Sequence, residues 1–223
     1  MLKVNGNGML IVVSGPSGAG KDTICNRLID EVDNIWISVS MTSRSPRDNE
    51  IEGKDYFFVT KEEFEQRKNN DEFLEYAIYN NNYYGTPKDK INYYLKAGID
   101  VILVIDIQGA LNIKKLVPSA LFIFIMPPDM RTLKKRLIDR KTETKEKVID
   151  RFKTAYNEIN NFKKYNYVVV NDEVINATNK VKAIIMAEKC RIDRIEDIHL
   201  DNREELIHEI LIDKEFDNGE VII

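Results

Sequence analysis

The fold is decided by the stretch Gly15-Pro16-Ser17-Gly18-Ala19-Gly20-Lys21-Asp22-Thr23, which joins an apolar run at residues 9–13 to a segment with apolar residues at helical spacing. This order predicts a strand, a tight loop and a helix. The glycines permit a backbone that points successive N–H groups at an anion. Lys21 adds a positive charge, and the helix directs its positive dipole end at the same place. The stretch therefore predicts a phosphate-binding loop.

The spacing of this loop follows the motif G-x-x-x-x-G-K through Gly15, Gly20 and Lys21. The next position of the motif carries Ser or Thr, whose hydroxyl binds the metal that accompanies a nucleotide. Here that position is Asp22, so the match is incomplete, and Thr23 is the nearest hydroxyl. The alternative is a glycine-rich turn between strand and helix that binds no nucleotide, as occurs in other α/β folds.

Composition favours one compact α/β unit, since the chain has 223 residues, 43% of them hydrophobic and 31% charged. A formal net charge of −4 argues against a general nucleic-acid surface. Cys25 and Cys190 lie far apart, which indicates reduced thiols. No stretch approaches the ~20 apolar residues of a membrane span. We therefore expect a soluble, cytoplasmic protein that binds neither nucleic acid nor membrane.

Residues 37–86 differ in character from the rest of the chain. Alternating segments at 36–40, 55–59 and 73–79 predict strands, and Thr60 with Glu63 forms a capping box for a helix that runs to about Asn69. Arg44 and Arg47 flank a turn in this block. Its aromatic, short-stranded pattern predicts a mixed or antiparallel lobe that is inserted into the main fold and binds a substrate.

Unbroken apolar runs at residues 101–105, 121–126 and 167–170 predict strands buried on both faces of a parallel sheet. Asp106 follows the first run, at the edge where open α/β sheets bind ligands and where the glycine-rich loop also lies. This placement makes Asp106 a candidate site residue. The alternative is that it only caps the next helix.

Basic residues gather in a later stretch, at Arg136, Arg140, Lys141, Lys145, Lys147 and Arg151. Arg136 and Arg140 are four residues apart, so they share one face of a helix. Such a cluster is commonly a solvated face. Opposite a phosphate loop it becomes a candidate lid.

Together these segments resemble guanylate kinase, a family of P-loop nucleoside monophosphate kinases. The resemblance covers roughly residues 8–195 and is carried by five blocks in family order: Ser38-Val39-Ser40 through Arg44-Ser45-Pro46-Arg47, Gly53-Lys54-Asp55-Tyr56-Phe57-Phe58, Asn82-Tyr83-Tyr84-Gly85-Thr86, Ile105-Asp106-Ile107-Gln108-Gly109 and Val170-Asn171-Asp172. It implies an α/β fold of P-loop NTPase type, with a central parallel sheet flanked by helices. The core would comprise residues 1–36, 87–133 and 156–195, with a GMP-binding lobe at 37–86 and a helical lid at 134–155. Residues 196–223 form a tail without an assigned role.

The resemblance also implies which residues bind GMP. Its phosphate would be held by Arg44, Arg47, Tyr56 and Tyr84, and its guanine by Glu75, Ser40 and Thr86. Arginine forks match phosphate oxygens, and tyrosine hydroxyls donate without adding charge. A buried carboxylate facing the N1–H and N2–H groups of guanine would discriminate against adenine, which lacks those donors.

For ATP, the resemblance implies that residues 15–23 cradle the phosphates and that Asn171 lies near the adenine. The catalytic set would be Lys21, Arg44, Asp106, Arg136, Arg140 and Arg151, acting through alignment and charge neutralisation rather than through a general base. Mg²⁺ would enter with the ATP phosphates. Asp22, Thr23 and Asp106 are its candidate protein partners, acting through water.

The sequence departs from the family pattern beside two of these residues. Val104 stands where the family commonly has an acid, two positions before Asp106, so the contact of that acid to base or metal is missing. Asp139 and Lys141 replace the glycines that usually flank the arginine at position 140. This replacement predicts either a stiffer lid hinge or a changed charge at the hinge.

The leading expectation is an enzyme of purine nucleotide metabolism that converts ATP and GMP to ADP and GDP. One alternative is a related P-loop kinase with another phosphorylated acceptor, which Val104 favours. Another is a non-catalytic guanylate-kinase-like interaction module, against which the intact Lys21 and lid arginines argue. Monomer and homodimer both remain open.

Overall fold

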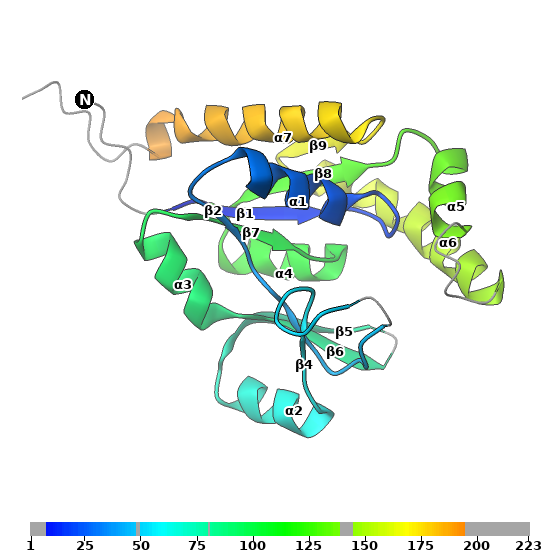
Figure 1. Cartoon of the computed structure of the whole chain (residues 1–223), viewed down its shortest axis with the longest axis horizontal. Helices are drawn as coiled ribbons and strands as arrows, with labels where there is room; N and C mark the ends of the chain where they lie inside the picture. The colour runs from blue at the N-terminus through cyan, green and yellow to red at the C-terminus, as the bar shows by residue number, and fades with distance from the viewer. Residues whose placement is uncertain (1–7, 48–49, 80, 139–144, 195–223) are drawn as a thin grey trace, which may run out of the picture.

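The centre of the protein is a five-stranded parallel sheet, seen in a computed structural model that describes residues 8–47, 50–79, 81–138 and 145–194 (Figure 1). Its strand order is β2-β7-β1-β8-β9. The strands are β1 (Leu10–Ser14), β2 (Ile35–Ile37), β7 (Asp100–Val104), β8 (Leu121–Met126) and β9 (Tyr167–Val170). The predicted parallel α/β fold is confirmed.

Helices cover both faces of this sheet, which explains why its strands are apolar throughout. Helices α1 (Lys21–Glu31) and α7 (Val174–Lys189) lie on one face, and α3 (Lys88–Lys96) and α4 (Ile107–Leu116) on the other (Figure 1). Along β1, Ile11 and Val13 pack towards α1 and α7, whereas Leu10 and Val12 pack towards α3 and α4. Every residue of β1 is buried.

A second sheet forms the inserted lobe, with strand order β4-β3-β6-β5. Its elements are β3 (Met41–Thr42), β4 (Phe57–Phe58), α2 (Lys61–Asn69), β5 (Phe73–Tyr79) and β6 (Asn82–Pro87). The β3–β4 pair is parallel and the other pairs are antiparallel. Phe64 of α2 stacks on Phe73 and Tyr83 at centroid distances of 4.4 and 5.0 Å. Thr60 caps α2 as predicted, because its hydroxyl accepts from the Glu63 N–H at 3.1 Å.

One local prediction was wrong in detail. A strand at 36–40 was expected to open the lobe, but β2 ends at Ile37, which pairs with Ile102 in the central sheet. Alternation of apolar and polar residues predicts a strand, but it does not predict with which sheet that strand pairs. Pro87 is the N-cap of α3. The last long helix, α7, ends at Lys189.

The segment expected to act as a lid is built on α5 (Met130–Ile138) and α6 (Lys145–Ile159). Leu133 and Leu137 of α5 pack on Phe152 and Ala155 of α6. A 3₁₀ turn, η1 (Asn160–Lys164), leads from α6 to β9. Among the helices of the described ranges, none is long and apolar enough to cross a membrane.

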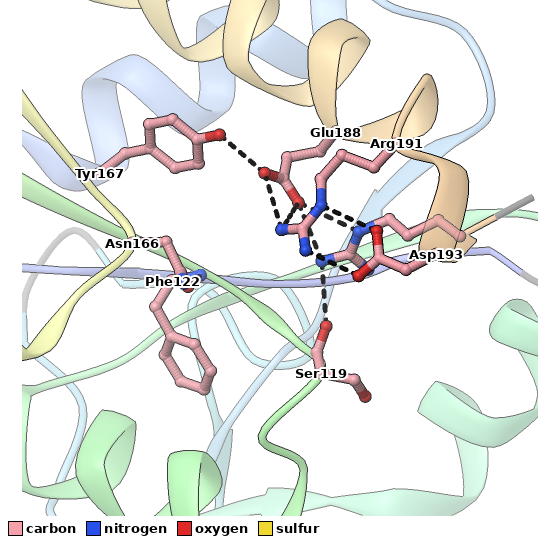
Figure 2. A network of polar contacts seen from close by, with 8 residues as sticks. Ser119, Phe122, Asn166, Tyr167, Glu188, Arg191 and Asp193 are labelled. Carbon is pink, nitrogen blue, oxygen red and sulfur yellow. Dashed lines mark hydrogen bonds and ion pairs between the residues drawn. The ribbon is translucent and has the colours of Figure 1, made fainter.

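The end of α7 is fastened to the sheet by a network around Glu188 (Figure 2). The buried Glu188 carboxylate accepts from the Tyr167 hydroxyl at 2.7 Å, from Arg194 Nε at 3.0 Å and from Arg191 Nη1 at 3.3 Å. Arg194 also donates to the Ser119 carbonyl at 3.0 Å, ahead of β8. Burial opposes ionisation of Glu188, but the hydrogen bonds from Tyr167 and Arg191 and the charge of Arg194 lower its pKa.

We expect Glu188→Ala to lower the free energy of unfolding by about 2 kcal/mol, since it removes the acceptor that joins α7 to β9. Because the pKa of Glu188 is lowered in the folded state, its contribution is present above the ordinary carboxyl pKa of about 4.3 and is lost as pH falls through the folded value. Urea denaturation at neutral pH measures the change. Asp193→Ala is the control, because Asp193 pairs with Arg191 at the surface and should cost under about 1 kcal/mol. Equal midpoints for the two variants would contradict the prediction.

Candidate active site

The glycine-rich loop leaves β1 and leads into α1 with the predicted geometry. Gly15, Gly18 and Gly20 have φ values of 145°, 86° and 90°, which favour glycine. A Cβ on Gly15 would lie 2.2 Å from the Ile125 carbonyl oxygen. The Lys21 ammonium folds back to donate to the Gly15 carbonyl at 2.7 Å. The loop is therefore held tightly against the carboxyl end of β8.

Two residues from distant parts of the chain hold the far end of the loop. Asn171, buried after β9, donates through Nδ2 to the Ala19 carbonyl at 2.7 Å. A Cβ on Gly20 would lie 2.3 Å from that same nitrogen. Arg136 of α5 donates to the Asn171 carbonyl at 3.1 Å and to the Ala19 carbonyl at 3.4 Å. In this structure both side chains contact the loop backbone.

A cleft of about 440 Å³ lies between the loop and the inserted lobe. This volume suits a small-molecule site. Most residues that the sequence singled out line it: Gly15, Ser17, Gly18, Gly20, Lys21, Asp22, Ser40, Arg44, Arg47, Tyr56, Glu75, Tyr84, Asp106 and Arg151.

Other predicted residues lie beside the cleft rather than in its lining, namely Pro16, Ala19, Thr23, Thr86, Arg136 and Asn171. Thr23 is exposed on α1. Arg140, with its neighbours Asp139 and Lys141, lies outside the described residues.

Glu75 of β5 is a buried carboxylate at the base of the cleft. Its Oε1 accepts from the Thr86 hydroxyl at 2.7 Å, across the β5–β6 pair. A Cβ on Gly109 of α4 would lie 3.0 Å from its Oε2, so a side chain at position 109 would crowd the carboxylate. Burial raises the pKa of Glu75 to about 7, assisted by the charge of Asp106 and opposed by the Thr86 hydrogen bond. Glu75 is thus poised between its neutral and ionised forms near neutral pH.

Arg44 is held by an acid that the sequence analysis did not single out. Its Nη2 donates to both carboxylate oxygens of Glu50 at 2.8 and 2.9 Å, and its guanidinium lies 5.5 Å from the centre of the Tyr56 ring. Glu50 Oε2 also accepts from the Arg47 N–H at 2.9 Å. An acid three residues after Arg47 was the only signal in the sequence.

Tyr56 lines the cleft and packs against a second tyrosine of the lobe. Its ring meets that of Tyr84 edge-on at a centroid distance of 6.1 Å. Burial raises the pKa of Tyr56 to about 12, and the negative charge of Asp22 contributes. The charge of Asp22, in the first turn of α1, thus disfavours ionisation of the Tyr56 hydroxyl.

Asp106 caps a helix and also lines the cleft, so a capping role does not exclude it from the candidate site. Its Oδ1 accepts from the Gly109 N–H at 2.7 Å at the start of α4. Val104, two residues earlier, also lines the cleft and is partly buried against the core beneath α1. An apolar side chain thus stands beside the Asp106 carboxylate.

Helix α6 brings two charged residues to the loop. Arg151 donates to the Ser17 hydroxyl. Glu158, two helical turns later, was missed by the sequence analysis and also lines the cleft. Burial raises the pKa of Glu158, with Lys21 opposing the shift and Asp106 adding to it. The charges of Lys21 and Asp106 therefore both act on Glu158.

A phosphate loop on a parallel sheet, facing a lobe that carries arginines and a buried carboxylate, defines a P-loop nucleotide kinase. Residues 7–188 match the sequence profile of guanylate kinase. The guanylate kinase of Clostridium tetani is 55% identical over 206 residues, 92% of this chain and 99% of that protein. That of Clostridium perfringens is 54% identical over 209 residues, 94% and 97% of the two chains. The crystal structure of guanylate kinase from Anaplasma phagocytophilum aligns with a TM-score of 0.73 at 34% identity, covering 86% of this chain and 91% of that one.

The chain belongs to the guanylate kinase family. The expectations of the family, of the fold and of an enzyme are confirmed, and the protein is a nucleotide kinase.

We expect guanine binding to weaken as pH falls through about 7, because protonation removes the negative charge of Glu75, the residue that the family resemblance assigns to the N–H groups of guanine. With a pKa of about 7, the affinity for guanosine should fall about tenfold between pH 8 and pH 6. Guanosine is the probe because it carries no phosphate that titrates in this range. The dissociation constant can be followed by calorimetry. Glu75→Gln should bind weakly at both pH values, and a wild-type affinity independent of pH would contradict the prediction.

Proposed function

We infer that this protein transfers the γ-phosphoryl group of ATP to GMP, forming ADP and GDP. The observation that carries this conclusion is one cleft with a phosphate loop and Lys21 on one side and Glu75 and Arg44 on the other. The relatives that match most of the chain are named guanylate kinases. Two nucleotides bound from opposite sides would bring donor and acceptor phosphates together in the cleft.

On the donor side, we propose that the loop N–H groups and Lys21 bind the ATP phosphates. The positive φ angles of the loop glycines turn backbone donors inward, and the α1 N-terminus adds its dipole. Asn171 and Arg136 would hold the loop in this conformation, since both donate to the Ala19 carbonyl. Asn171 is also our candidate for the adenine side of the site.

On the acceptor side, we propose that Arg44, Arg47, Tyr56 and Tyr84 bind the GMP phosphate and that Glu75, Ser40 and Thr86 bind guanine. Arg44 is pre-oriented by its ion pair and by the ring of Tyr56. Glu75 is buried and keeps one oxygen on Thr86, so its second oxygen is available to the base. A base without the N1–H and N2–H donors would leave that carboxylate poorly paired.

We propose that Arg136, Arg140 and Arg151 stabilise charge on the transferring group when the lid of residues 134–155 closes over the lobe of residues 37–86. Arg151 already reaches the loop at Ser17. Closure would also exclude water and limit hydrolysis of ATP. Alignment and charge neutralisation carry the transfer, so no general base is assigned.

The family implies a kinase that needs a divalent metal with ATP, and we propose Mg²⁺. The donor set fits, because the carboxylates Asp22 and Asp106 both line the cleft and Mg²⁺ prefers oxygen ligands. When bound, the metal would neutralise phosphate charge. Asp22 and Asp106 would orient its water ligands, with Thr23 as a further hydroxyl on α1. We place the enzyme in the cytoplasm, in keeping with two cysteines that form no disulfide.

A coupled assay of ADP formation tests the function directly. We expect turnover with ATP and GMP and at least a hundredfold lower kcat/KM with AMP, UMP or dTMP, since only guanine presents two N–H donors to Glu75. The Glu75→Gln enzyme should lose most of this preference. A clear preference for another monophosphate would favour the alternative kinase with a different acceptor.

Lys21→Ala should lower kcat by about a hundredfold or more, because it removes the positive charge of the loop. Asp22→Ser should keep kcat within about tenfold of wild type or raise it, since serine restores the motif hydroxyl and removes a negative charge near the phosphates. Steady-state kinetics at saturating Mg²⁺ measures both. Collapse of the Asp22→Ser enzyme would instead identify Asp22 as a direct metal ligand.

A further inference from the structure

Glu50 contacts the Arg44 side chain, the Arg47 side chain and the Arg47 backbone within one turn. Its carboxylate accepts from Arg44 Nη2 through both oxygens, at 2.8 and 2.9 Å. One of those oxygens accepts from the Arg47 backbone N–H at 2.9 Å, and the other lies 3.7 Å from Arg47 Nη1. The Glu50 N–H in turn donates to the Arg47 carbonyl at 3.0 Å. The acid therefore binds both side chain and main chain of the turn.

Arg44 is fixed by these contacts and by its other neighbours. Its Nη1 donates to the Ser45 carbonyl at 2.6 Å, and its guanidinium lies 5.5 and 5.8 Å from the ring centres of Tyr56 and Phe58. The side chains of Arg44 and Glu50 are only 17% and 15% exposed. A long, flexible side chain has thus lost its rotamer freedom within the protein itself, which removes that cost from ligand binding.

Resting on the proposed function, we propose that Glu50 is a positioning residue of the acceptor site: it holds the Arg44 guanidinium and the Arg47 segment in the orientation that binds the phosphate of GMP. Nothing in the family resemblance or the sequence patterns assigns it this role. Glu50 lines the same cleft as both arginines, so its contacts lie at the site itself.

The main alternative is that the Glu50 carboxylate competes with the phosphate for Arg44. A negative charge at hydrogen-bond distance does weaken the attraction of one arginine for an anion. Two observations favour positioning. Two guanidinium groups share one carboxylate, which leaves a net positive charge, and Glu50 also binds the Arg47 backbone, which a simple counter-ion would not need.

The test compares Glu50→Gln with the control Glu52→Gln. Glutamine keeps the length of Glu50 and one acceptor oxygen but cannot bind Arg44 through two charged oxygens. Glu52 is an acid of the same turn whose carboxylate accepts from the Phe58 N–H at 2.9 Å. Binding of GMP, guanosine and ATP is measured by calorimetry, and kcat and KM by the coupled assay.

For Glu50→Gln we expect the Kd and KM of GMP to rise about tenfold, equivalent to about 1.4 kcal/mol. The Kd of guanosine and of ATP should be unchanged, and kcat should stay within about threefold, because only the phosphate contact is affected. Glu52→Gln should match wild type in every measurement.

Three results would overturn the proposal. Tighter GMP binding by Glu50→Gln would show competition, equal weakening of GMP and guanosine would show a role in folding of the lobe, and unchanged GMP binding would show no role. Absence of GMP turnover by the wild-type enzyme would instead contradict the proposed function, whatever the variant does.

Discussion

The site depends on how closely the phosphate loop packs against the sheet. Gly15 lies so near the Ile125 carbonyl, and Gly20 so near Asn171, that no side chain fits at either position. Asn171 and Arg136 then bind the Ala19 carbonyl, and Lys21 binds that of Gly15. With its carbonyls engaged on one side, the loop can present its N–H groups to the cleft. The lobe and the lid are placed relative to this loop, because Arg136 contacts its backbone and the lobe lines the other side of the same cleft.

The inserted lobe contains two largely buried ionisable side chains, Glu75 and Arg44, whose partners differ in charge. Glu75 is buried with a neutral hydroxyl as its partner, and burial raises its pKa to about 7. Arg44 is largely buried against a carboxylate, and its guanidinium remains charged. The first arrangement leaves a carboxylate whose best partner is a pair of N–H donors, and the second holds a cation in place. The cleft lining thus offers a hydrogen-bond acceptor at Glu75 and a fixed positive charge at Arg44.

Much of the fold was predictable because its signals are local. The apolar runs that became β7, β8 and β9, the Thr60 cap of α2 and the helix after the glycine-rich loop each depend on neighbouring residues. The prediction failed where the local pattern did not decide the outcome. The alternating residues near Trp36 are compatible with a strand in either sheet. The Trp36 ring packs on Tyr94 of α3 at a centroid distance of 4.4 Å, which places this strand in the central sheet. Most of the site residues that the family resemblance named line the cleft, but they did not include Glu50 or Glu158.

By itself, the sequence determined a phosphate loop between a strand and a helix, a parallel sheet, and a lobe bearing Arg44, Arg47 and Glu75. These follow from glycine positions, periodicity and motif spacing, which are properties of short segments. Only the tertiary structure decided that Asn171 donates to the Ala19 carbonyl from 152 residues away and that Glu158 and Lys21 line the same cleft. Contacts between residues so distant in the chain produce no periodic signal, because the folded backbone alone sets which side chains meet.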